Sequence, residues 1–132
     1  MRIVIDTNVV ISGTFFGGNP RRVIEAVVDR EVDASASAPI LEEYDDVVTE
    51  IIRRGYGHFN AEGFRRFVET LDLVSPTTRV EVCRDPDDDK FIECAVDARA
   101  LYIVSGDKDL LDLKSFGGVE IVTATEFCEK YL

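Results

Sequence analysis

Short apolar runs alternate with amphipathic stretches along the chain, a pattern that predicts alternating strands and helices. The apolar runs predict strands at residues 3–5, 32–35, 73–74, 101–104 and 120–122, with a further extended piece at 80–82. Apolar residues at helical spacing predict helices at residues 20–29, 61–71, 87–99, 110–111 and 123–131. A further helix is predicted to start at Ser37-Ala38-Pro39 and to stop at Gly55. Residues 12–19 are predicted to form a loop with at most one helical turn.

This alternation indicates a parallel sheet with helices on both faces. We therefore expect an α/β fold of three layers, α/β/α, around a central parallel sheet of about four to five strands. A chain of 132 residues with 45% hydrophobic content has room for one core. Residues 1–132 are accordingly expected to form a single domain.

The first predicted strand ends in a polar sequence that its apolar start does not explain. Ile3, Val4 and Ile5 suit a strand buried on both faces, and Asp6-Thr7-Asn8 follows at once. A carboxylate at the end of a buried strand is costly unless it meets a metal, a cation or hydrogen-bond donors. In parallel α/β sheets, this edge is also where ligands bind. Asp6 is therefore the first candidate for a functional site.

Composition narrows the classes of function. The net charge of −11 disfavours a nucleic-acid binder that relies on a basic patch alone. It is compatible with an enzyme that holds phosphates through divalent cations, and with a basic protein partner. Three scattered cysteines and a single histidine predict neither a disulfide framework nor a zinc site. Without an apolar run of roughly 20 residues or a signal-like N-terminus, we expect a cytoplasmic protein.

Helical geometry selects further carboxylates. In the helix after Pro39, Glu43 lies beside the apolar face, whereas Asp45 borders its opposite edge and remains an alternative. In the helix that follows the acidic run 85–89, Asp88 is predicted to point into the apolar face, and Asp85 or Asp87 is expected to cap the helix.

The last candidate, Asp107, follows the strand 101–104 directly, and it would emerge near Asp6 if the two strands were neighbours. Converging carboxylates repel one another unless a cation joins them. Oxygen donors with almost no histidine or cysteine favour one or two hard divalent ions, Mg²⁺ or Mn²⁺.

Four segments, in this order and at this chain length, resemble a known family. They are IDTNV at the start, SAPILEEYDDV, DPDDDKFIECA and IVSGDKDLL. The chain resembles the PIN-domain ribonucleases, in particular the small VapC-like toxins of toxin–antitoxin pairs. The resemblance implies a PIN-like nuclease domain in which Asp6, Glu43, Asp88 and Asp107 hold the metal and act in catalysis. It also implies supporting roles around them for Asn8, Ser105 and Asp109, and Asp85 is a further supporting candidate. An acidic residue at Asp89 departs from the family pattern, which leaves open whether Asp88 or Asp89 reaches the metal.

The implied activity is metal-dependent endonucleolytic cleavage of single-stranded or structured RNA. The resemblance further implies a cognate antitoxin and a homodimer. An RNA-processing enzyme, a 5′-nuclease and a non-catalytic binding module with the same fold are the alternatives. Six basic residues are candidates for RNA contacts, and three further residues are candidates for base stacking. The basic residues are Arg21, Arg22, Arg53, Arg54, Lys90 and Lys108, and the stacking candidates are Tyr56, His58 and Phe59.

Overall fold

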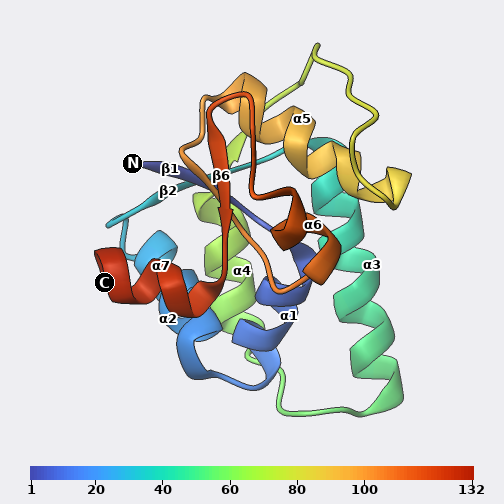
Figure 1. Ribbon diagram of the computed structural model, residues 1–132. Helices are drawn as coiled ribbons and strands as arrows, with labels where there is room; N and C mark the ends of the chain where they lie inside the picture. Colours follow the sequence, from blue (N-terminus) through green and yellow to red (C-terminus); the bar gives the residue numbers. More distant parts are fainter.

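A computed structural model describes residues 1–132 and shows a twisted, mainly parallel sheet between layers of helices (Figure 1). The sheet has six strands in the order β3-β2-β1-β4-β6-β5, and only β5 runs antiparallel to its neighbour. The strands are β1 (Arg2–Ile5), β2 (Asp33–Ala36), β3 (Asp72–Leu73), β4 (Tyr102–Val104), β5 (Ser115–Phe116) and β6 (Val119–Val122). The predicted α/β/α class with a central parallel sheet is confirmed.

The sheet differs from the prediction at its edges. β5 has only two residues and pairs with β6 across the turn at Gly117 and Gly118, so no apolar run marks it. The predicted extended piece at 80–82 lies outside the sheet. The sheet therefore has six strands rather than the expected four to five.

Seven α-helices and one short 3-10 helix complete the fold. They are α1 (Thr7–Phe15), α2 (Gly18–Val28), α3 (Ala38–Arg54), α4 (Ala61–Thr70), η1 (Pro86–Asp88), α5 (Asp89–Ala98), α6 (Lys108–Leu113) and α7 (Ala124–Tyr131). In Figure 1, α5 lies on one side of the sheet, and α2, α4 and α7 lie on the other. None of these helices is both long and apolar enough to cross a membrane.

The helix α1 corrects the prediction of a loop at residues 12–19. It starts directly after β1 and is buried around most of its circumference, so it has little of the one-sided pattern that reveals a helix in sequence. Gly13 lets α1 approach α2 closely, because a Cβ atom there would lie 2.8 Å from Cγ1 of Ile24 and 2.9 Å from the carbonyl oxygen of Pro20. The turn from β1 into α1 fixes the position of Asp6 at the sheet edge.

The register of the central strands brings two polar segments together. Ile5 of β1 is paired with Val104 of β4, and the backbone N–H of Asp6 donates to the carbonyl oxygen of Val104 at 2.9 Å. Residues Ile3 to Ile5 of β1 and all three residues of β4 are buried, which fixes the register of the two strands against slippage. Residues 105–107 therefore leave the sheet beside Asp6.

An extended segment, residues 77–83, which we call the strap, is held by carboxylates rather than by a neighbouring strand. Asp97, Glu93 and Asp89 are spaced four residues apart on α5 and so lie along one side of the helix. They accept backbone N–H groups of the strap from Thr77 and Thr78, from Val80, and from Val82 and Cys83, respectively. The carboxylates of α5 thus satisfy backbone donors that a sheet would otherwise pair.

Replacing Asp97 by Ala is expected to release the first part of the strap. Hydrogen bonds from the side chain and N–H of Thr78 and from the N–H of Thr77 lower the pKa of Asp97. The ionised carboxylate therefore stabilises the fold above the pKa of the unfolded chain, and this contribution is lost as the pH falls through the lowered value. Amide hydrogen exchange at Thr77 and Thr78 should accelerate by about tenfold in the variant. Glu129→Ala, which removes an exposed helix carboxylate on α7, should leave these amides unchanged.

Candidate functional site

The four predicted carboxylates line one pocket at the carboxyl edge of the sheet, with a volume of about 510 Å³. Asp6 follows β1, Glu43 lies in the second turn of α3, Asp88 ends η1, and Asp107 precedes α6. We call this cavity the carboxylate pocket. The other residues that line it are Thr7, Asn8, Ile11, Ser12, Val47 and Ile51.

Asp6 is the most deeply placed of the four, with 5% of its surface exposed. Its Oδ2 accepts a hydrogen bond from Oγ of the fully buried Ser105 at 2.6 Å. Burial raises the pKa of Asp6, although the Ser105 hydrogen bond opposes this effect. The fold therefore holds a carboxylate in a place where its charge is disfavoured without a cation.

Ser105 also fixes the neighbouring turn. Its Oγ accepts the backbone N–H of Asp107 at 2.9 Å, and Oδ1 of Asp107 caps α6 by accepting the N–H of Asp109 at 3.1 Å. Asn8 accepts the N–H of Gly106 at 3.3 Å. Two side-chain hydrogen bonds thus join the end of β1 to the turn after β4, and a third holds the turn itself. The side chain of Asp109 is exposed and lies 3.9 Å from Arg84.

Glu43 is held from two sides. Its Oε2 accepts a hydrogen bond from Oγ1 of Thr7, and its Oε1 accepts Nζ of Lys90 at 2.8 Å. The preceding and following acidic residues of α3, namely Glu42, Asp45 and Asp46, are exposed. Asp45, the alternative that helical geometry left open, does not line the carboxylate pocket.

The acidic run divides its roles in a way that the helical pattern did not predict. Asp88 belongs to η1 rather than to the regular helix, and it is half-buried in the carboxylate pocket. Asp89 is 8% exposed, and its Oδ1 accepts the N–H groups of Val82 and Cys83 from the strap. Asp85 caps η1 through the N–H of Asp87 at 3.0 Å and lies outside the pocket.

The two acidic neighbours in this run titrate in opposite directions. Burial raises the pKa of Asp88 to about 7, and the nearby charges of Asp6 and Asp107 add to the effect. For Asp89, the hydrogen bonds from Cys83 and Val82 outweigh its desolvation and lower its pKa. The negative charge of Asp88 is thus disfavoured in the pocket, whereas the charge of Asp89 is stabilised by the backbone of the strap.

The donor set of the pocket fits a hard divalent ion, because carboxylate, hydroxyl and amide oxygens dominate it. As arranged here, no three acidic, histidine or cysteine side chains converge closely enough to ligate one ion. The hydrogen bond from Thr7 and the ion pair with Lys90 engage both oxygens of Glu43. Metal ligation would therefore require side-chain rearrangement of at least one carboxylate.

A second cavity, of about 620 Å³, shares Glu43 with the carboxylate pocket. We call it the acidic groove. Its charged residues come from α3, η1 and α5, and Lys90 is the one cation among them. They are Glu42, Glu43, Asp46, Asp87, Asp89, Lys90 and Glu93.

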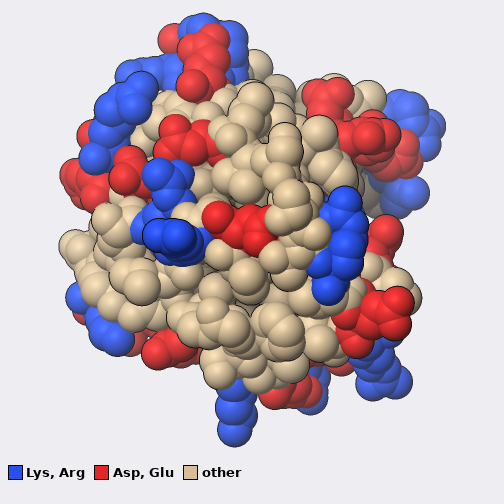
Figure 2. Space-filling view, turned by 90° about the horizontal axis from the view of Figure 1, so that it is seen from above, with Lys and Arg blue, Asp and Glu red and all other residues tan.

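Most of the predicted RNA-contacting cations lie away from the carboxylate pocket or are already paired. Arg21 and Arg22 belong to α2, where they bond to Gly13 and Asn19. Arg53 and Arg54 pair with Glu50 near the end of α3. Lys108 pairs with Asp112 on α6. Figure 2 shows cations and carboxylates interspersed on the face that it presents, with no continuous basic patch.

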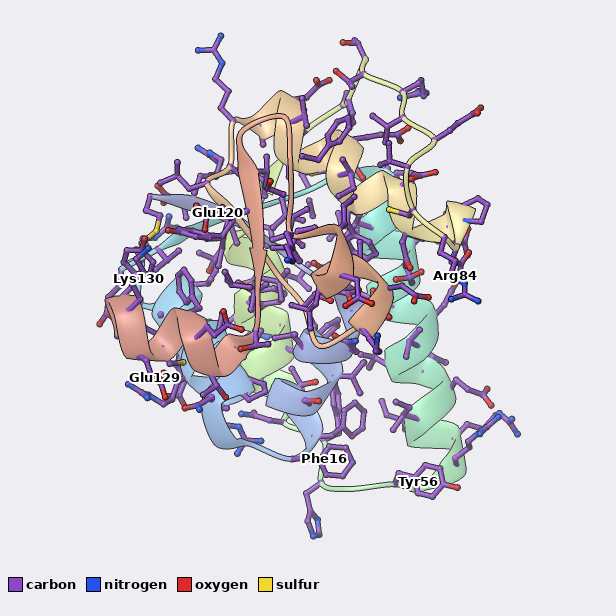
Figure 3. All side chains as sticks on the ribbon, viewed as in Figure 1. Phe16, Tyr56, Arg84, Glu120, Glu129 and Lys130 are labelled. Atoms are coloured by element: carbon purple, nitrogen blue, oxygen red, sulfur yellow. The ribbon has the colours of Figure 1, made fainter.

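Of the candidates for base stacking, Phe59 is packed in the interior, and Tyr56 and His58 are exposed. Phe59 is half-buried and packs on Phe15 with ring centroids 5.0 Å apart, so it belongs to the interior. Tyr56 is 59% exposed, and the unpredicted Phe16 is 66% exposed. Figure 3 shows both rings directed to solvent, Phe16 just after the C-terminal end of α1 and Tyr56 just after that of α3. His58, in the loop with Tyr56, is also exposed.

Two further residues support the site. Thr7 had no role in the sequence-based interpretation, yet it donates to Glu43 and lines the pocket. Its place in the polar triplet that ends β1 was the available signal. The fully buried Tyr44 donates to the carbonyl oxygen of Ile5 and so ties α3 to the end of β1. Nothing distinguished Tyr44 in the sequence from the other apolar positions of its helix.

Comparisons with known proteins agree with this geometry. A family model described as PIN domain matches residues 2–109, which include all four carboxylates of the pocket. The uncharacterized protein MJ1680 of Methanocaldococcus jannaschii is 29% identical over 143 aligned positions, which cover 99% of this chain and 92% of that protein. No solved structure gives a significant match. Because the family model spans most of the chain, the chain belongs to the PIN domain family.

Proposed function

We propose that this protein is a metal-dependent endoribonuclease that cleaves single-stranded or structured RNA as the toxin of a toxin–antitoxin pair. The observation that carries the proposal is the pocket in which Asp6, Glu43, Asp88 and Asp107 meet at the carboxyl edge of a PIN-domain sheet. PIN domains are generally nucleases and usually use divalent metal ions. Mg²⁺ or Mn²⁺, as one or two ions, is the cofactor that these oxygen donors favour.

In this proposal, the four carboxylates hold the cation directly or through water. A divalent cation supplies charge neutralisation at the scissile phosphate and a more acidic water nucleophile. Ser105 orients Asp6 through its hydroxyl, and Thr7 orients Glu43 in the same way. Asn8 holds the turn that presents Asp107. The hydrogen bonds of Ser105 and Asn8 hold Asp6 and the turn before Asp107 in place before RNA arrives, whereas Glu43 must give up a partner to reach the ion.

The acidic groove supports the proposed protein partner. Six of its residues are acidic, so a basic segment of an antitoxin would gain favourable charge contacts there. A homodimer is part of the same proposal. RNA, by contrast, would reach the pocket through the cation and through the few basic residues near it, Lys90 and Lys108.

A cleavage assay on purified protein tests the proposal. Single-stranded and hairpin RNAs, each labelled at one end, would be incubated with Mn²⁺, with Mg²⁺ or with EDTA. We expect internal cuts that leave a 5′-phosphate, only when a divalent ion is present. Stepwise shortening from the 5′ end would favour the 5′-nuclease alternative. Absence of cleavage on every RNA, or cleavage that persists in EDTA, would contradict the proposal.

A further inference from the structure

Lys90 differs from the other lysines of the chain in its degree of burial. Its side chain is 16% exposed, whereas Lys108, Lys114 and Lys130 are exposed residues. A lysine is seldom buried to this extent unless its ammonium is paired. Here Nζ donates to Oε1 of Glu43 and to the carbonyl oxygen of Asp87, both at 2.8 Å. Lys90 therefore joins α3 to η1 at the border of the carboxylate pocket.

Lys90 also distinguishes Glu43 from the other carboxylates of the pocket. Glu43 forms an ion pair with Lys90, whereas Asp6, Asp88 and Asp107 form none. The ammonium thus offsets part of the negative charge that four neighbouring carboxylates concentrate. It does so at the residue whose second oxygen is already bonded to Thr7.

The position of this pair separates two cavities. Glu43 lines both the carboxylate pocket and the acidic groove, and Lys90 lines the acidic groove and a smaller cavity beside it. The ammonium and a cation in the pocket would compete for the same carboxylate. If Glu43 turned to a divalent ion, Nζ would lose its charged partner and keep only the carbonyl of Asp87. A lysine so released is a point charge suited to a phosphate.

We propose that Lys90 is a positioning residue whose ammonium serves as the counter-cation of Glu43. When a divalent ion binds Glu43, the ammonium of Lys90 would leave Glu43 and bind a phosphate of RNA instead. This inference rests on the proposed function. The exchange makes ion uptake and RNA binding mutually favourable, because each removes a cost from the other. Lys90 therefore weakens the binding of the ion when RNA is absent, and RNA removes this effect by binding the ammonium of Lys90.

Calorimetric titration of Mn²⁺ into wild-type and Lys90→Met protein tests the inference. The measurement is made with and without a single-stranded RNA that carries 2′-O-methyl groups, which is used as a non-cleaved probe. We expect Lys90→Met to bind Mn²⁺ about tenfold more tightly in the absence of RNA, because the competing charge is gone. The tightening that RNA produces in the wild type should be several-fold smaller in the variant, because only the direct contact between the phosphate and the ion remains.

Matched variants separate this exchange from a merely structural contact. Lys90→Arg should retain most of the coupling, and Lys114→Met, at an exposed lysine without an ion pair, should behave as the wild type. Circular dichroism checks that each variant is folded. If Lys90→Met does not fold, Lys90→Gln replaces it in the titration. Unchanged or weaker Mn²⁺ binding in the Lys90 variant, in a protein that still cleaves RNA, would overturn the inference and leave the proposed function standing. Failure of the wild type to bind Mn²⁺ and to cleave RNA would overturn both.

Discussion

Replacing Asp6 by Asn is expected to abolish metal-dependent RNA cleavage while leaving the fold intact. Loss of residues that only support metal ligands costs about 10- to 100-fold in affinity or activity, so loss of a ligand should cost more than about 100-fold. The amide oxygen of Asn can still accept the hydrogen bond from Ser105. Burial raises the pKa of Asp6, so the native pocket disfavours its charge, and the neutral amide removes that cost.

The measurement combines initial cleavage rates with thermal unfolding. Asp6→Asn should unfold at the same temperature as the wild type or at a higher one, in buffer that contains EDTA. Asp45→Asn is the matched control, because Asp45 lies on α3 near Glu43 but is exposed and outside the pocket. Full activity of Asp6→Asn would refute the assignment of Asp6, and loss of activity in Asp45→Asn would show that charge near the pocket matters more than ligation.

The stability of the metal-free protein is expected to fall as the pH rises from about 4 to about 8, and Asp88 should account for part of the fall. Burial raises the pKa of Asp88 to about 7, whereas an aspartate in an unfolded chain has a pKa of about 3.9. Between these values the native protein holds a proton that the unfolded chain has lost. Stability therefore decreases with pH across this window, and the loss is complete above the native pKa.

Asp88→Asn should flatten this dependence. Because Asp88 is only half-buried, solvent screening reduces the gain at pH 8 to about 1–2 kcal/mol, or a rise in the unfolding midpoint of roughly 3–8 °C. Thermal unfolding of both proteins in EDTA, at pH values from 5 to 8, measures this difference in the unfolding midpoint. Asp87→Asn, at the exposed neighbouring residue, should retain the wild-type slope. An identical slope in Asp88→Asn would show that other groups are responsible.

The sequence predicted those parts of the fold that a local pattern determines. The helix after Pro39 and the strand before Ser105 have strong periodicity or β-branched runs, and both are present with nearly the expected bounds. The helix α1 was missed because a helix buried around most of its surface has no amphipathic pattern. The strand β5 was missed because two residues leave no pattern at all.

The site was predictable to the extent that strand ends and helix faces determine it. Asp6 and Asp107 follow adjacent buried strands, and the pairing of β1 with β4 places both at one edge. The partners of Glu43, by contrast, come from 36 and 47 residues away in the sequence. Thr7 and Lys90 meet Glu43 only through tertiary packing. The polar triplet that ends β1 marked Thr7 without indicating its partner, and no local pattern marked Lys90. Asp88 ends the 3-10 helix η1 and Asp89 begins α5, so the geometry of one regular helix could not separate their roles.

The strap has a consequence for how the rim of the acidic groove can diversify. Five of its backbone N–H groups are satisfied by Asp89, Glu93 and Asp97, which belong to another element, and the side chains of Val80, Glu81 and Val82 take no part in its hydrogen bonding. Val80 of the strap lines the acidic groove, and Arg79 lines the adjoining cavity. Substitutions in the strap can therefore change the shape and charge of this rim while the three carboxylates keep its path. Descendants of this chain could acquire a new binding preference there without a compensating change in the sheet or in the carboxylate pocket.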